Sequence, residues 1–464
     1  MLVAGYHPFV EDAEIYLPGV EKVLNPELFP FNAQFFADHA GHTLFPYLMA
    51  WSVRLTHLSL PVVLFFWQWV SIFLFLLACW QLSGRCFSDK TARWAGVTLI
   101  AALLTLPVAG TALYILDQYV NPRNLAACLM IFAVVKILDK KFISAGLFLI
   151  LAALTHPFMA GFAIFLCALL AVMQNFEKDA ARFAILVPFG LTLAPPPAAY
   201  HQVALRHHEH YLIRWQWYEL LGAIAPIFIL AWMARLARSR QLRNFELLCR
   251  GLIAYLLICL PIALVLSIPA RLEALARLQP MRCLYLLYIL MFLFAGCLLG
   301  EYVLKNRMWR WAALFVPLCA GMFVAQRSLF PYSAHVEWPG AAPKNPWVQA
   351  FLWAGENTPV NAVFALGPNS AKLPTEDEQG FRANAERSSL ADSKDAGAAS
   401  MFPPLADEWL RQSQAQNGWE NFTQNDFQRL HDQYGVTWVI VQQPRGQGMD
   451  CPYQNNLVRV CRVQ

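Results

Sequence analysis

Residues 60–83 read LPVVLFFWQWVSIFLFLLACWQLS, a stretch without a single charged residue. It is longer than the roughly 20 apolar residues that a helix needs to cross a bilayer, so it predicts a membrane-spanning helix. The whole chain shares this character, since 58% of its 464 residues are hydrophobic and 14% are charged. This composition excludes an ordinary soluble enzyme of this length and predicts a polytopic α-helical membrane protein.

Other apolar segments extend this prediction along the chain, although several are shorter than a straight spanning helix requires. They are residues 93–116, 124–138, 142–155, 157–174, 180–198, 219–236, 245–268, 283–304 and 309–328. Segment 142–174 is interpreted as a broken pair of helices, because Pro157 follows His156 between its two apolar runs. The sequence therefore predicts about ten spans.

The links between these spans differ in charge. One set of links carries the basic residues Arg85, Lys90, Arg93, Lys136, Lys140, Lys141, Lys178, Arg182, Arg235, Arg238, Arg240, Arg243, Lys305, Arg307 and Arg310. The positive-inside rule places that side in the cytoplasm, and the long N-terminal and C-terminal segments on the opposite side. Because Met1–Gly5 looks like the last turn of a helix and no other segment would carry residues 1–58 across, we expect a further span upstream.

The predicted topology divides the chain into three parts. Residues 1–58 form an outer loop with interfacial helices, in which Tyr47 and Trp51 suit the headgroup region. Residues 59–329 form the transmembrane bundle. Residues 330–464 have ordinary polarity and alternate helical patterns, among them 376–385 and 424–434, with Val- and Ile-rich strands, which predicts a small extracytoplasmic α/β domain. Its two cysteines, Cys451 and Cys461, are either a disulfide or two unpaired thiols.

Candidate functional residues converge on the predicted outer face from four separate segments. They are His7, Glu11, Asp12, Glu14, Asp117, Arg123, His156, Gln279 and Arg282. Unpaired charges are costly in lipid, so these groups are expected at the water boundary. This gathering of acids, histidines and arginines predicts the chemical end of the protein. The net charge of +5 is small for this size and argues against nucleic acid as a partner.

Each candidate also has a structural explanation. The acids Glu11 and Glu14 lie one turn apart and suit a helix N-terminus. The arginines can extend from a span to the interface, and His156 can cap a helix. The histidine-rich run 206–210 is interpreted as a solvated interfacial loop in preference to a metal centre, because it lacks helical ligand spacing.

The acidic pair Glu11-Asp12 stands in a long first outer loop, ahead of many spans of uneven length and a C-terminal outer domain. This layout resembles the GT-C superfamily of integral-membrane glycosyltransferases, in particular uncharacterised bacterial members. The strand Tyr434–Val441 is also similar to a strand common in the outer domains of such enzymes. The resemblance implies a multi-pass protein of the bacterial cytoplasmic (inner) membrane with a periplasmic C-terminal domain.

The resemblance further implies transfer of a sugar from a polyprenyl-phosphate-linked donor to an acceptor at the outer face, with inversion at the anomeric carbon. Asp12, with Glu11 as second choice, is the expected general base. Arg282, Arg123 and His156 are expected to bind the carrier phosphate. The remaining candidates are expected to bind substrate; they are His7, Glu14, Asp117 and Gln279.

A divalent cation, Mg²⁺ or Mn²⁺, shared by Asp12 and Asp117 would suit the oxygen ligands, although no pattern requires it. Two other functions stay open at the sequence level. One is a transporter or flippase for a lipid-linked or amphiphilic solute, and the other is a membrane protein that has kept the GT-C architecture without catalysis. The transporter would be expected to show charged residues at mid-membrane and two related halves.

Overall fold

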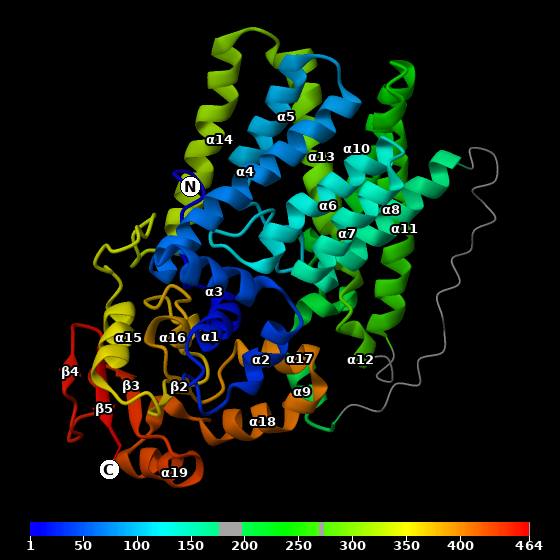
Figure 1. Cartoon of the computed structure of the whole chain (residues 1–464). Coiled ribbons are helices and arrows are strands. Elements are labelled where there is room, and N and C mark those ends of the chain that lie inside the picture. The colour runs from blue at the N-terminus through cyan, green and yellow to red at the C-terminus, as the bar shows by residue number, and fades with distance from the viewer. Residues whose placement is uncertain (176–196, 269–272, 464) are drawn as a thin grey trace.

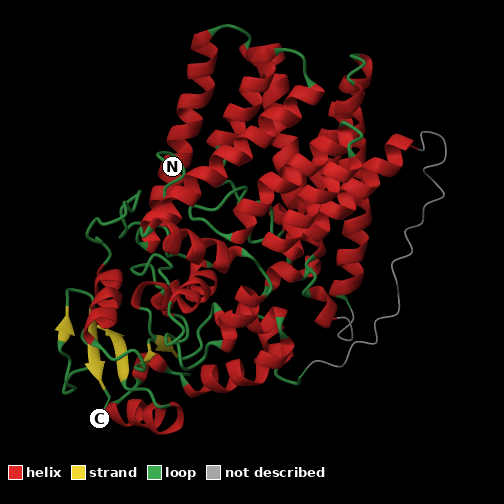
Figure 2. Cartoon of the chain, viewed as in Figure 1, coloured by secondary structure: helices red, strands yellow, loops and turns green. Residues whose placement is uncertain are grey.

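The computed structural model describes residues 1–175, 197–268 and 273–463. Helices make up most of the described chain, and a small sheet lies near the C-terminus (Figure 2). A bundle of long helices occupies one half of the molecule, and the N-terminal and C-terminal segments lie together in the other half (Figure 1). The N-terminal helices α1–α3 and the C-terminal segment thus share the half of the molecule beside the bundle.

Six described helices are long and apolar enough to cross a membrane. They are α4 (Leu60–Cys86), α8 (Pro157–Asn175), α10 (Trp217–Ser239), α11 (Arg243–Ser267), α14 (Met308–Leu329) and the helical run Pro280–Leu304, whose main part is α13 (Leu284–Leu299). The apolar window of the α13 run is 83% buried, whereas that of α14 is 6% buried. α13 therefore lies at the centre of the bundle and α14 at its edge, with apolar side chains exposed as lipid contact requires. These helices indicate a membrane-embedded protein.

The predicted span 93–116 is wrong in its second half. α5 (Lys90–Ala102) ends early, and residues 103–121 form a folded loop in which the Val108 N–H donates to the Leu113 carbonyl oxygen (2.8 Å). Ile115 and Leu116 in this loop are almost fully buried. The segment is apolar because it packs inside the protein, where a non-helical backbone is tolerated at membrane depth.

Two apolar helices are shorter than a straight spanning helix. α6 (Pro122–Leu138) packs against α7 (Phe142–Thr155), and α7 meets α8 at the single residue His156. The predicted break inside segment 142–174 is confirmed, because Pro157 cannot continue the hydrogen bonding of α7. The predicted span 180–198 lies outside the described residues except for its last two positions.

The N-terminal segment forms three short helices beside the bundle. They are α1 (Ala13–Leu24), α2 (Gln34–Gly41) and α3 (Phe45–Thr56). α3 buries Phe45 and Met49 against α1 and leaves Tyr47, Trp51 and Leu55 more than half exposed. A helix with one packed face and one exposed aromatic and apolar face suits the interface of a bilayer.

The C-terminal segment holds a five-stranded sheet in the order β2-β1-β3-β5-β4. The strands are β1 (Val363–Ala365), β2 (Ser388–Ser389), β3 (Trp438–Gln442), β4 (Tyr453–Gln454) and β5 (Val458–Arg462). β1 pairs in parallel with β2 and β3, and β5 pairs antiparallel with β3 and β4. The helices of this segment are α15 (Pro346–Asn357), α16 (Phe381–Ala385), α17 (Asp395–Met401), α18 (Ala406–Ala415) and α19 (Gln424–Tyr434).

Sequence patterns located most of these elements. The predicted helix at 424–434 coincides with α19, where Thr423 and Asp426 form a capping box. The predicted helix at 376–385 is wrong in its first half, because Asp377 and Glu378 both have positive φ values (57° and 53°) that no α-helix accommodates. Cys451 and Cys461 are joined in a disulfide that ties β5 to the segment before β4.

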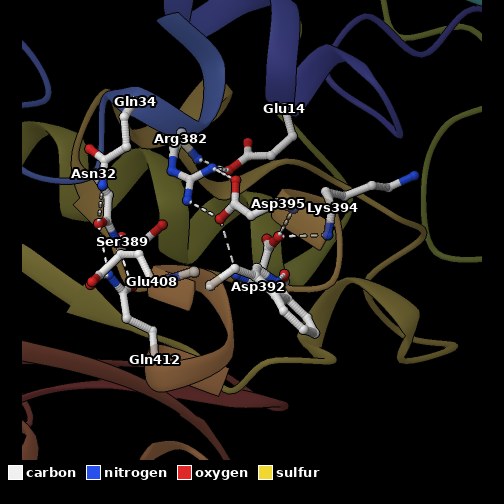
Figure 3. Close-up of polar contacts among 12 residues, drawn as sticks. Glu14, Asn32, Gln34, Arg382, Ser389, Asp392, Lys394, Asp395, Glu408 and Gln412 are labelled. Atoms are coloured by element: carbon white, nitrogen blue, oxygen red, sulfur yellow. Dashed lines mark hydrogen bonds and ion pairs between the residues drawn. The ribbon is translucent and has the colours of Figure 1, made fainter. Parts of the chain in front are cut away.

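A buried polar cluster connects the N-terminal helix α1 to the C-terminal segment (Figure 3). The Arg382 guanidinium donates to both oxygens of Asp395 (2.9 and 2.6 Å), and it lies 3.7 Å from a Glu14 oxygen. The Glu14 carboxylate also accepts the backbone N–H groups of Arg382 (3.0 Å) and Ala383 (3.2 Å). All three charged side chains are at most 3% exposed. This network fixes the position of α1, and with it the acidic pair that directly precedes α1.

Candidate functional site

A cavity of about 700 Å³ opens where the N-terminal segment, the bundle and the C-terminal segment meet. Six of the residues predicted for the site line it. They are Glu11, Asp12, Arg123, His156, Gln279 and Arg282. These residues come from four distant parts of the sequence, so the fold brings them to one cavity.

The acidic pair is held in place through its backbone. Glu11 has a positive φ of 53°, and its N–H donates to the Glu378 carbonyl oxygen (2.9 Å). The Asp12 N–H donates to the hydroxyl oxygen of Tyr119 (3.1 Å). Within the described part of the chain, neither carboxylate accepts a hydrogen bond, and the Asp12 side chain does not cap α1, which it directly precedes. Both side chains therefore keep their hydrogen-bonding capacity for a ligand.

The two carboxyl groups differ in protonation. Burial raises the pKa of Glu11 to about 8, against the opposing effect of Lys394. Burial also disfavours the charged form of Asp12, but Lys394, Arg123 and Arg282 outweigh it and lower the pKa of Asp12. At neutral pH Glu11 thus holds a proton while Asp12, whose side chain is 38% exposed, is ionised. Adjacent residues offer a proton donor and an anionic acceptor to the same cavity.

Arg123 joins the two aspartates that the sequence proposed as metal ligands. Its guanidinium donates to Asp117 Oδ2 through Nε (3.1 Å) and Nη2 (2.7 Å), and Nη2 lies 3.8 Å from Asp12 Oδ2. Asp117 is 2% exposed and does not line the cavity, so it positions the Arg123 side chain without contacting the cavity itself. A divalent metal ion shared by Asp12 and Asp117 stays a prediction. In this structure, the positive charge that lies near both carboxylates is the guanidinium of Arg123.

Arg282 is a buried cavity cation that is available to a ligand. No ion pair or hydrogen bond joins its side chain to another residue in the described ranges, and its Nε is buried without a partner. The guanidinium lies over the ring of Phe158, 5.4 Å from the ring centroid. A stacked arginine with unused donors can bind an anion through its planar fork.

Two further predicted residues line the cavity from helix ends. His156 Nδ1 accepts the Met159 N–H (3.3 Å), so the histidine caps α8, as its structural explanation proposed. Gln279 has a positive φ of 44° and its Nε2 contacts the sulfur of Met401 (3.5 Å). Each side chain contacts the cavity while also shaping the local backbone.

His7 and Glu14 do not line the large cavity. His7 is fully buried, with Nδ1 2.9 Å from Glu337 Oε1 and its ring stacked on Phe330 at 4.0 Å. Glu14 is committed to the buried cluster with Arg382 described above. Both residues make contacts that hold the fold together, and substrate binding by either of them stays a prediction.

Two charged or titratable cavity residues illustrate what the sequence missed. Lys394 lies beside the acidic pair, its Nζ 3.3 Å from Glu378 Oε2, and the two acids together with Glu378 raise its pKa against the effect of burial. His39, on α2, contacts the ring of Phe402 edge-on, and burial lowers its pKa to about 4. Neither residue belongs to a spaced motif, so only the folded chain brings them to the site.

The histidine-rich run also reaches the cavity. His207, Glu209 and His210 line it, and the ring nitrogens of the two histidines lie 2.8 Å (His207 Nδ1) and 3.8 Å (His210 Nε2) from Glu209 Oε1. Burial opposes ionisation of Glu209, but the hydrogen bond to His207 and the charges of both histidines lower its pKa to about 2. The run thus forms part of the cavity wall, while Arg206 and His208 within it remain exposed.

A search of protein-family models finds none that matches this chain, and a search of curated proteins finds no match either. Function is therefore argued from the geometry of the cavity.

Proposed function

We propose that this protein is a membrane glycosyltransferase that moves a sugar from a polyprenyl-phosphate-linked donor to an acceptor hydroxyl. The observation that carries the proposal is one cavity that contains an ionised carboxylate, Asp12, and an arginine with unused donors, Arg282. Sugar transfer from a phosphate leaving group needs a base for the acceptor and a cation for the phosphate. The cavity supplies both.

Each residue has a defined part in the proposed reaction. Arg282 binds the donor phosphate and stabilises the negative charge that grows on it as the glycosidic bond breaks. Asp12 accepts the hydrogen bond of the acceptor hydroxyl and takes its proton as the new bond forms. Arg123 keeps Asp12 ionised, and protonated Glu11 donates a hydrogen bond to substrate. A single displacement of this kind inverts the anomeric carbon.

The size and position of the cavity support a lipid-linked donor. Its volume of about 700 Å³ falls within the usual range for ligand sites, and it has room for a phosphosugar. Its lining includes Thr43, just before α3, and His156, directly after α7. Both helices carry exposed apolar or aromatic side chains; these include Tyr47, Trp51, Ile143, Leu147 and Ile150. Such surfaces suit contact with lipid, so a polyprenyl chain can remain in the bilayer while its head group enters the cavity.

The proposal includes the finer topology that the sequence predicts. About ten spans in the bacterial inner membrane would place the cavity at the outer face, with a C-terminal α/β domain in the periplasm. The asymmetry of basic links supports this orientation. The Cys451–Cys461 disulfide also supports it, since disulfides persist in oxidising compartments.

Cleavage of the donor is the direct test, because it needs no knowledge of the acceptor beyond supplying a mixture of cell-envelope fractions. Purified protein in nanodiscs is given polyprenyl-phosphate-linked sugars, and release of polyprenyl phosphate is followed by mass spectrometry. Wild type should release it, and Asp12→Asn should lose at least a hundredfold in rate, the usual range for a general base. The matched control is Asp38→Asn, an acid on α2 that does not line the cavity.

The rival functions give different results in this experiment. A transporter would move the lipid-linked solute across sealed vesicles and leave its mass unchanged, while a non-catalytic protein would bind without either result. Equal rates for wild type and Asp12→Asn would remove Asp12 from its proposed role.

A further inference from the structure

The cavity wall contains a preformed group of metal-ligating side chains. The ligand atoms of His207, Glu209 and His210 all lie within 4.8 Å of one another. In residues 1–175, 197–268 and 273–463, no other set of three His, Cys, Asp or Glu side chains is as close. The side chains of the three residues are 17%, 15% and 4% exposed, so the group is largely shielded from bulk solvent.

The backbone holds this group together without an ion. His207 is followed by a 3₁₀ turn, η2 (His208–His210), in which the His210 N–H donates to the His207 carbonyl oxygen (3.2 Å). Trp215 Nε1 donates to the Glu209 carbonyl oxygen (3.3 Å). A turn fixed in this way lowers the ordering cost of binding.

We propose that His207, Glu209 and His210 bind one divalent metal ion of the zinc type. Two imidazole nitrogens and one carboxylate form the ligand set of many catalytic zinc sites, which keep a fourth position open for water or substrate. Magnesium and calcium prefer oxygen ligands and suit this set poorly. Tetrahedral zinc ligands lie roughly 3.3 Å apart, given zinc–ligand distances of about 2.0–2.1 Å. The measured separations of 2.8 and 3.8 Å from Glu209 Oε1 lie on either side of that value.

The open position of this ion faces the cavity, because all three ligands line it. One carboxylate leaves the bound ion with net positive charge, so the open position attracts an anion. This step rests on the proposed function: the anion there is the phosphate of the donor, which the metal and Arg282 bind together. The metal would thereby add to the charge stabilisation of the leaving phosphate.

Metal binding can be measured without any activity assay. The full chain, without a polyhistidine tag, is stripped with a chelator in nanodiscs, dialysed against micromolar Zn²⁺ and analysed by elemental mass spectrometry. Wild type should retain one zinc per chain, and His210→Ala and Glu209→Gln should each retain less than a tenth of that. The matched control is His208→Ala, whose side chain is 59% exposed and lies outside the group; it should retain one zinc. Melting curves of each variant without zinc check that the fold is kept.

The open position is tested with cobalt, which reports its coordination by visible absorption. Inorganic phosphate added to the Co²⁺-loaded wild type should change the spectrum, and it should leave the Co²⁺-exposed His210→Ala variant unchanged. Absence of stoichiometric zinc in the wild type, or equal zinc in His210→Ala, would overturn the site. A spectrum indifferent to phosphate would overturn the open position.

The metal site and the proposed function can fail separately. Stoichiometric zinc in a protein that cleaves no lipid-linked donor would support the metal site and contradict the glycosyltransferase. Full donor cleavage by a wild-type protein that retains no zinc would contradict the metal site alone.

Discussion

At the scale of single residues, the central feature is that two adjacent carboxyl groups are in different states. Glu11 and Asp12 share a backbone turn, yet among the described residues only Asp12 lies within 4 Å of a guanidinium, that of Arg123. The pKa of Glu11 rises to about 8 through burial, whereas that of Asp12 falls. The local environment, and not the residue type, therefore makes Glu11 the proton donor and Asp12 the base.

This difference predicts the pH dependence of the reaction. Glu11 is protonated below about pH 8 and becomes an anion as pH rises through that value, which places a second negative charge beside Asp12 and the donor phosphate. We expect the donor-cleavage rate to fall about tenfold per pH unit above pH 8. Glu11→Gln, which cannot ionise, should be slower at pH 7 but should lack this alkaline fall. The measurement is the initial rate between pH 6 and 9.5.

The same experiment has a clear negative result. If Glu11→Gln shows the wild-type alkaline limb, another group with a similar pKa controls the rate. The control variant is Glu27→Gln, an exposed acid between α1 and α2 that lies outside the cavity, and its profile should match the wild type.

At the scale of elements, the buried cluster around Arg382 fixes α1 against α16 and α17. Loss of one partner of a buried ion pair leaves an uncompensated charge, which costs about 3–5 kcal/mol. Arg382→Met would leave Asp395 and Glu14 without their cation, so we expect a large fall in melting temperature. The change is measured on purified protein in one detergent.

Arg411→Met is the matched control for that variant. Arg411 is an exposed residue that pairs with Glu408 on the surface of α18. Surface pairs of this kind contribute about 1 kcal/mol or less, so its melting temperature should stay close to that of the wild type. Equal melting temperatures for the two variants would contradict the structural role of the cluster.

The disulfide gives a second prediction for an element. It closes a loop between residues 10 positions apart, and the chain-entropy relation gives about 2–3 kcal/mol for such a loop. Cys461→Ser should therefore lower the stability of the sheet, measured as faster proteolysis of the C-terminal segment. Cys319→Ser, in α14, is the control and should leave proteolysis unchanged. Equal proteolysis of Cys461→Ser and wild type would contradict a stabilising disulfide.

At the scale of the whole molecule, the cavity exists only because three distant parts of the chain meet. Hydropathy alone was sufficient to predict helices such as α4, α11 and α14, since their apolar length is a local property. It failed for residues 103–116, whose apolar character reflects burial in protein and not a span.

Part of the site could be predicted, because the charged residues of several links fall on the same predicted face of the membrane bundle. Asp12, Arg123 and Arg282 were found in this way. Lys394 and His39 were not, because their place depends on contacts between the N-terminal and C-terminal segments, such as the Glu11 N–H bond to Glu378. Long-range pairing of this kind leaves no periodic signal in one sequence.

The proposed topology is itself testable. Alkaline phosphatase, which is active only in the periplasm, is fused after Gln464 and, in a second fusion, after Arg240 in a basic link. We expect high activity for the first fusion and low activity for the second, because basic links stay in the cytoplasm. The reverse pattern would put the cavity on the cytoplasmic side and contradict an outer-face reaction.

The most direct test of the central claim is the position of a bound donor. Cryo-electron microscopy of the protein with a non-cleavable polyprenyl-phosphate sugar analogue would locate both the phosphate and the anomeric carbon. We predict that the phosphate lies within hydrogen-bonding distance of Arg282 and that the anomeric carbon faces Asp12. A cavity that stays empty at saturating analogue, or a phosphate bound away from Arg282, would contradict the proposal.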